Sequence, residues 1–195
     1  MKKRIFAIAV IAICLSILAT TTLAYYTATD VARSAITSDG IDINIEEFKA
    51  DGSAYPTGAV KVMPSTEVDK VVHIRNLDRD SFVRAQIILT MKKDGKVTDF
   101  DPSLVTITMG SSKWLPKEGS EGWWYYDAVL GPGGLTEPLM TKVSFSSQMG
   151  NAYQGCTFEV TILSQAVQAD HNGTSVLEAL GWPGEPLPAP VVPEE

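Results

Sequence analysis

Residues Ile41-Asp42-Ile43-Asn44-Ile45-Glu46 alternate strictly between apolar and polar side chains. Successive side chains of a β-strand point to opposite faces of a sheet, so this alternation is typical of a strand with one face buried. A sheet face of this kind needs a second apolar layer to cover it. The stretch therefore predicts that the chain folds as packed β-sheets.

Further apolar segments of strand length follow, separated by turns rich in Gly, Pro, Asp and Ser. The turn Lys93-Asp94-Gly95-Lys96 has the Asp-Gly pair typical of a β-hairpin. We expect eight or nine strands, no crossover helices, and therefore an all-β antiparallel β-sandwich. Immunoglobulin-like and jelly-roll topologies both fit this pattern. The expected strands after the first are 60–62, 68–75, 82–91, 104–109, 123–130, 139–145 and 156–167.

Helical periodicity is scarce, and the best candidate is one short C-terminal helix over Ser175 to Leu180. Thr174 or Ser175 would cap this helix, with Val176, Leu177 and Leu180 facing inward. After Trp182 the chain holds five prolines in eleven residues. Because proline cannot donate sheet hydrogen bonds, we expect an extended or disordered tail over residues 183–195.

The amino terminus has the composition of an export signal. Three basic residues within Met1 to Arg4 precede the apolar run Ile5 to Ala19, and small residues at Thr22 and Ala24 suit a signal peptidase. We expect cleavage between Ala24 and Tyr25. This divides the chain into a signal peptide (1–24), a β-sandwich domain (25–182) and the tail. An uncleaved membrane anchor is the alternative.

Residues 1–24 contain three of the 16 basic residues and none of the 23 acidic ones, so the remaining chain has a net charge of −10. Such a surface repels phosphate backbones and anionic lipid, which argues against nucleic-acid binding and against membrane contact after cleavage. Cys156 is the single cysteine of that remaining chain. It lies in an apolar run, and we expect a buried small hydrophobe.

Six short elements, taken in order, resemble the TasA/camelysin family of exported proteins, whose signal peptides are cut by a SipW-type signal peptidase. Ser65 stands where that family usually has glycine. The elements are the junction Thr22-Leu23-Ala24-Tyr25-Tyr26-Thr27-Ala28-Thr29-Asp30, then Ser38-Asp39-Gly40-Ile41-Asp42-Ile43, Met63-Pro64-Ser65 with Val72-His73-Ile74-Arg75-Asn76, Phe82-Val83-Arg84, Trp124-Tyr125-Tyr126 with Leu130-Gly131-Pro132-Gly133 and Thr136, and Ala166-Val167-Gln168-Ala169 with Trp182.

The resemblance implies a jelly-roll sandwich secreted to the cell surface or biofilm matrix, where subunits form fibres or associate with them. In that family a freed amino-terminal segment can pair with the sheet of the next subunit. Residues 25–38 would be this donor segment, pairing either with another subunit or with their own domain. The side chains that would enter pockets are those of Tyr25, Tyr26, Ala28, Val31 and Ile36.

Two other functions are alternatives. Camelysin-type members have been classed as metalloendopeptidases, but His73 and His171 are the two histidines and form no zincin motif. Neither a Gly-x-Ser-x-Gly elbow nor a recognisable Cys–His pair is present. We therefore expect no catalytic residues, no metal and no cofactor. The run Trp123-Trp124-Tyr125-Tyr126 offers one aromatic pair to each face of a strand, as core, as a subunit contact or as a glycan-binding surface.

Overall fold

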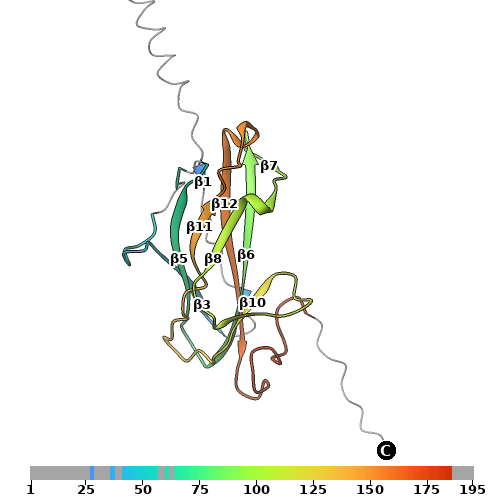
Figure 1. Cartoon of the computed structure of the whole chain (residues 1–195). Coiled ribbons are helices and arrows are strands. Elements are labelled where there is room, and N and C mark those ends of the chain that lie inside the picture. Colours follow the sequence, from blue (N-terminus) through green and yellow to red (C-terminus); the bar gives the residue numbers. More distant parts are fainter. Residues whose placement is uncertain (1–26, 29–35, 38–40, 57–59, 62–63, 186–195) are drawn as a thin grey trace, which may run out of the picture.

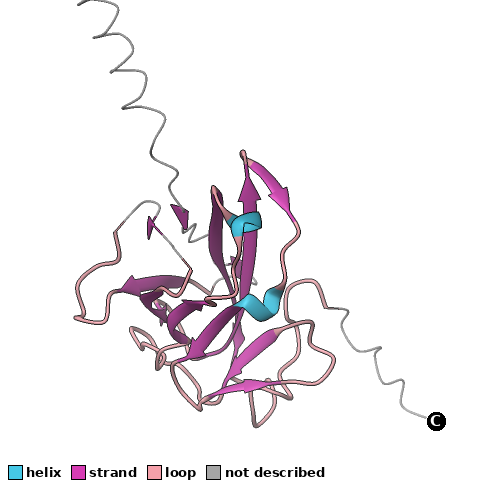
Figure 2. Cartoon of the chain, turned by 45° about the horizontal axis from the view of Figure 1, so that its top comes forward, coloured by secondary structure: helices cyan, strands magenta, loops and turns pink. Residues whose placement is uncertain are grey.

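A computed structural model describes residues 27–28, 36–37, 41–56, 60–61 and 64–185. These residues form two β-sheets packed face to face as a sandwich (Figure 1). The predicted all-β sandwich is therefore confirmed. The described residues contain two short 3₁₀ turns, Pro102–Leu104 and Asn151–Tyr153, and no α-helix (Figure 2). None of their helices has the length and apolar character needed to cross a membrane.

The larger sheet is built on two long strands, β6 (Ser81–Lys93) and β12 (Cys156–Gln168), which pair antiparallel along their full length. Its strand order is β4-β1-β12-β6-β10-β9, with β2 also on β12 and β7 also on β6. The other strands are β1 (Thr27–Ala28), β2 (Ile36–Thr37), β4 (Val60–Lys61), β7 (Lys96–Thr98), β9 (Trp114–Pro116) and β10 (Trp123–Tyr126).

The smaller sheet is antiparallel, with the order β3-β5-β11-β8. Its first strand contains Ile43 and Ile45 of the alternating stretch, and Ile43 is buried in the core as the pattern predicts. The four strands are β3 (Ile43–Phe48), β5 (Glu67–Asn76), β8 (Val105–Met109) and β11 (Met140–Phe145).

The main core lies between the two sheets, where alternate residues of each strand face inward. Val72 and Ile74 come from the smaller sheet, and Phe158 and Ile162 come from β12 of the larger sheet. Cys156 belongs to this core and is fully buried, as its sequence context predicts.

A second apolar cluster covers the opposite face of the larger sheet, where residues 169–185 fold back over β6, β10 and β12. Coverage of both faces explains why β6 is buried at the consecutive positions Ser81 to Ala85. The buried members of this outer cluster are Phe82, Tyr125, Val167, Val176, Ala179 and Trp182.

The predicted helix over Ser175 to Leu180 is wrong, because these residues form turns and loop. The Asn172 side chain competes with helical hydrogen bonds: it donates to the Leu180 carbonyl at 3.0 Å and accepts from the Leu180 amide at 2.9 Å. Val176 is buried as expected, whereas Leu180 is 52% exposed. The segment is held by a polar loop closure rather than by an amphipathic helix.

Two turns contain residues with a left-handed backbone conformation. The predicted tight turn at Lys93-Asp94-Gly95-Lys96 joins β6 to β7, with φ of +51° at Asp94 and +76° at Gly95. Both central residues are left-handed, as a two-residue hairpin turn requires. Ser65 also has a left-handed φ, +63°, so it adopts the conformation for which glycine is the usual residue.

Candidate functional site

The first candidate site is the edge of β12 that faces away from β6. β1 and β2 both pair with this edge and run parallel to β12, whereas the other strand pairs of the described residues are antiparallel, as predicted for the sandwich. Thr27 lies opposite Thr157, and Ile36 lies opposite Gln165. The amino-terminal segment therefore pairs with both ends of β12 within the same chain.

The two registers differ by one residue. The segment advances nine residues from Thr27 to Ile36, while β12 advances eight from Thr157 to Gln165. Because strands rise by a nearly constant distance per residue, β1 and β2 are spaced along the chain almost as their partners are spaced along β12.

The structure describes two of the five donor residues that were predicted from the sequence. Ala28 is in β1 and Ile36 is in β2. Tyr25, Tyr26 and Val31, together with the cleavage site at Ala24, lie outside the described residues.

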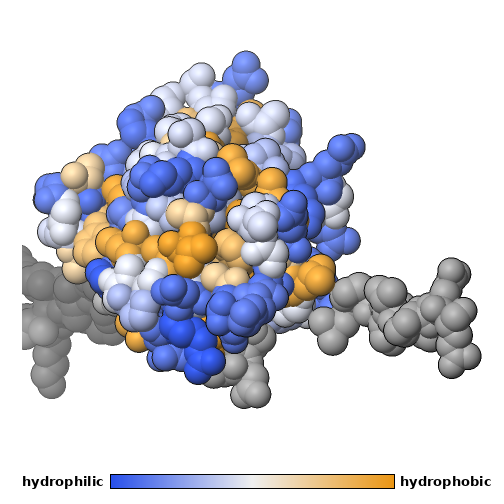
Figure 3. All heavy atoms as spheres, turned by 90° about the horizontal axis from the view of Figure 1, so that it is seen from below, coloured by the Kyte–Doolittle hydropathy of each residue, from blue (hydrophilic) through white to orange (hydrophobic). Residues whose placement is uncertain are grey.

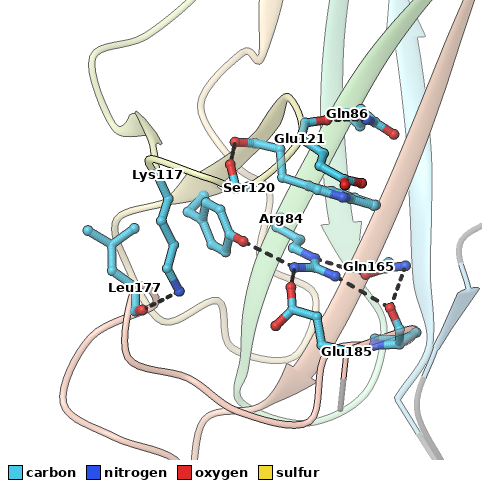
Figure 4. A network of polar contacts seen from close by, with 11 residues as sticks. Arg84, Gln86, Lys117, Ser120, Glu121, Gln165, Leu177 and Glu185 are labelled. Atoms are coloured by element: carbon cyan, nitrogen blue, oxygen red, sulfur yellow. Dashed lines mark hydrogen bonds and ion pairs between the residues drawn. The ribbon is translucent and has the colours of Figure 1, made fainter.

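The second candidate site is a buried arginine on the outer face of the larger sheet. The Arg84 side chain is 2% exposed, although arginine is rarely buried without partners. Its Nε donates to Gln165 Oε1 at 2.9 Å, and its Nη1 donates to the Tyr125 hydroxyl at 3.1 Å and to the Glu185 carboxylate. Figure 4 shows Gln165 and Glu185 converging on the guanidinium from different elements.

Aromatic rings enclose the same guanidinium. The Arg84 Cζ atom lies 4.3 Å from the ring centroid of Trp123 and 4.7 Å from that of Trp182. Tyr125 packs edge-on against Trp182, with ring centroids 5.7 Å apart. Cation–π attraction strengthens when water is excluded, so these rings favour retention of the charge inside the outer cluster.

A cavity of about 530 Å³ opens beside this arginine. One wall comes from the sheet, including Arg84, Trp123 and Tyr125, and the opposite wall comes from the loop 117–121 and residues 183–185. Lys117 contributes a second cation, whose Nζ donates to the Leu177 carbonyl at 2.9 Å (Figure 4). The site combines two cations with aromatic rings and can accept a carboxylate.

The aromatic run is divided between the two faces of β10, as the alternation predicts. Trp123 and Tyr125 pack with the outer cluster, and Trp124 and Tyr126 pack with the main core. Both tyrosines are buried and both tryptophans are partly buried. Neither pair is fully exposed, and the residues of the run that line the cavity are Trp123 and Tyr125.

A second buried cation lies within the smaller sheet. Lys70 Nζ is 2.7 Å from Glu47 Oε2 and 4.5 Å from the ring centroid of Tyr55. Burial raises the pKa of Glu47 to about 7 and lowers the pKa of Lys70 to about 7. Charged and neutral forms of this pair therefore lie close in free energy near neutral pH.

The two histidines occupy different environments. His73 Nδ1 lies 2.8 Å from the Thr136 carbonyl, and the His73 ring packs edge-on against Phe48. His171 is almost fully exposed. Within the described ranges, no group of three or more His, Cys, Asp or Glu side chains is arranged to hold a metal ion.

Arg84, Gln165 and Lys70 were not among the site residues predicted from the sequence. One signal was available, because Arg84 interrupts the apolar run Phe82 to Met91 and a buried cation needs a partner. Its partner Glu185 lies 101 residues away, in the segment expected to be a tail. No sequence period connects the two.

Comparison of the chain with protein-family models, curated proteins and solved structures finds no match in any of the three.

Proposed function

We propose that this protein is a secreted structural subunit of the cell surface or biofilm matrix, released by a SipW-type signal peptidase and assembled by strand addition. In this proposal the sandwich has a jelly-roll topology. Subunits associate with copies of themselves or with related matrix subunits, and the protein is not an enzyme. The motif resemblance to TasA/camelysin proteins supports the proposal.

The observation that carries the proposal is the pairing of β1 and β2 with the edge of β12. An extended peptide that adds a strand to a sheet edge gains main-chain hydrogen bonds whichever molecule supplies it. The same edge that accepts β1 and β2 within one chain can accept them from a neighbour. Exchange of this segment along a row of subunits is heterologous and does not close, so it extends as a filament.

The loop end of the molecule offers a further contact surface. It is the end at which β2 pairs with β12, and Figure 3 shows hydrophobic side chains gathered there, seen from below. Contiguous exposed apolar surface is typical of an interaction site. Four large exposed hydrophobic residues belong to loops of that end: Leu77, Val129, Leu135 and Leu180.

Cysteine cross-linking tests whether the segment exchanges. Cysteines are introduced as Thr27→Cys and Thr157→Cys, the facing pair of β1 and β12, in a Cys156→Ala background. We expect a bond within one chain in the monomer and bonds between chains in filaments grown before oxidation. Isotope-labelled and unlabelled subunits, mixed and analysed by mass spectrometry, separate the two. Filaments that contain intrachain bonds alone would contradict strand addition.

Two controls accompany this test. Thr27→Cys combined with Thr106→Cys, at an exposed position of β8 in the other sheet, should give little cross-linking in either state. A chain starting at Gly40 should form no filaments under electron microscopy, because it lacks the donor segment. If the chain starting at Gly40 forms filaments as well as the chain starting at Tyr25 does, residues 25–38 are not the donor segment.

A further inference from the structure

Residues Pro183, Gly184 and Glu185, which we call the strap, cover Arg84 from the outside. The strap forms a turn in which the Glu185 amide donates to the Trp182 carbonyl at 3.0 Å, and Gly184 has a φ of +84°. Pro183 offers its carbonyl to Arg84 Nη2 at 3.4 Å, while Glu185 offers its carboxylate to Nη1. The strap therefore presents a carbonyl and, two residues later, a carboxylate.

The receiving side of this contact is built on strands of the larger sheet. Arg84, Tyr125 and Gln165 come from β6, β10 and β12, three adjacent strands of one sheet. Gln165 and the Tyr125 hydroxyl hold the guanidinium so that both terminal nitrogens face the strap. Side chains locked on strands by neighbouring hydrogen bonds form precise binding sites. The sheet thus carries the receptor, and the strap behaves as its ligand.

The strap is loosely retained by comparison. Glu185 is 47% exposed while its partner Arg84 is 2% exposed, and the cavity of about 530 Å³ continues past it toward Lys117. Water reaches Arg84 through this cavity, so losing the Glu185 carboxylate alone costs little in stability while leaving the guanidinium open to another carboxylate of the same geometry.

We propose that the Arg84 site is a receptor for an acidic peptide turn, and that it exchanges its own strap for the strap of a second copy. A second copy supplies the same carbonyl and carboxylate with the same spacing. The strap follows Trp182, which stays in its own outer cluster, so two copies facing each other exchange straps reciprocally about a two-fold axis. This contact pairs copies independently of strand addition through residues 27–37.

A labelled peptide of residues 183–195 tests the proposal in trans, using protein recovered from cells that express the full chain. The strap of the wild type competes within its own molecule at high effective concentration. Glu185→Gln removes that competitor's charge, so fluorescence anisotropy should show at least about tenfold tighter peptide binding by this variant than by the wild type. A peptide carrying Glu185→Gln should bind neither protein.

Matched controls make the result decisive. Asp99→Asn removes the same charge from an exposed position at the β7 end of the molecule, and should leave peptide binding at the wild-type level. Equal binding of the peptide to wild type and Glu185→Gln, or equal binding of the two peptides, would overturn the proposal. So would a Glu185→Gln variant that binds galacturonate oligomers but not the peptide. If that variant folds poorly, wild-type protein at millimolar peptide gives the same comparison between the two peptides.

Discussion

Arg84 and Lys70 are both cations with 2% exposed side chains, yet they are neutralised in different ways. Arg84 has an amide oxygen, a phenol, a carboxylate and two indole rings around it. Lys70 has the carboxylate of Glu47 at 2.7 Å and the ring of Tyr55. The first site is a network and the second is a pair.

The difference follows from the two side chains. A guanidinium is planar, stacks on aromatic rings and donates in several directions, so it can be buried as a cation when enough acceptors converge. An ammonium is a compact, strongly hydrated charge whose pKa shifts readily on burial. Arg84 therefore organises a binding site around a permanent charge, whereas Lys70 and Glu47 form a pair that can lose its charge.

The largest effect is expected from breaking the network. Arg84→Ala removes the stacking partner of Trp123 and Trp182 and leaves Gln165 and the Tyr125 hydroxyl without their donor. We expect a loss of about 3–5 kcal/mol in the free energy of unfolding, the usual cost of breaking a buried ionic network. Urea denaturation measures it. A loss under about 1 kcal/mol would mean that Arg84 contributes no more to stability than an ordinary surface ion pair does.

Replacing Glu47 and Lys70 together should not lower the free energy of unfolding, in contrast to Arg84→Ala. In Glu47→Leu combined with Lys70→Met, two groups that burial penalises are exchanged for apolar side chains of similar size. Glu47 Oε1 is also buried without a hydrogen-bond partner among the described residues. We expect the double variant to be as stable as the wild type or more stable by about 1–4 kcal/mol.

The single variants sharpen that comparison. Lys70→Met leaves a buried carboxyl that can take up a proton, so we expect a loss of about 1–3 kcal/mol in the free energy of unfolding. A double-mutant cycle in urea gives the coupling between the two residues. A double variant less stable than both single variants would contradict the view that the pair carries a net desolvation cost.

These contrasts also mark how far the sequence could predict the structure. The alternation at Ile41 to Ile45 and the Asp94-Gly95 turn are local patterns, and the structure follows both. The helix expected over Ser175 to Leu180 failed because Asn172, outside that window, closes the loop through its side chain.

The candidate sites depend on contacts that no local pattern contains. Arg84 meets Glu185, which lies 101 residues later, and Lys70 meets Glu47 from a neighbouring strand. Strand pairing between β1 and β12 joins residues 130 positions apart. Such pairings are set by packing of the whole sandwich, so a periodicity argument identifies the strands but not the partners.

The pair should also make stability depend on pH. Glu47 has a folded pKa of about 7, above its ordinary 4.5, so the folded chain holds the extra proton between these values and stability falls as pH rises. Lys70 has a folded pKa of about 7, below its ordinary 10.5. Between these values the unfolded chain holds the extra proton, so stability rises as pH rises. The contribution of the pair therefore has a minimum near pH 7.

The difference in urea stability between the wild type and the Glu47→Leu, Lys70→Met variant isolates this contribution, because the other titrating groups cancel. We expect this contribution to change by at least about 1.4 kcal/mol on each side of the minimum, the equivalent of one pKa unit. A difference that stays constant from pH 5 to pH 9.5 would mean that the pair remains charged throughout. Arg84→Lys offers the converse test, since a lysine placed in the aromatic network should acquire a pH dependence of its own.

The smallest effect on stability is expected at the outer end of the network. Glu185 is about half exposed, and a charge pair in contact with water contributes less than about 1 kcal/mol. Glu185→Gln should therefore change the urea midpoint little, while Arg84→Ala changes it greatly, although the two residues share one ion pair. A loss at Glu185→Gln as large as that at Arg84→Ala would make the strap part of the folding core. A small loss together with a large gain in peptide binding would separate occupancy of the Arg84 site from stability of the fold.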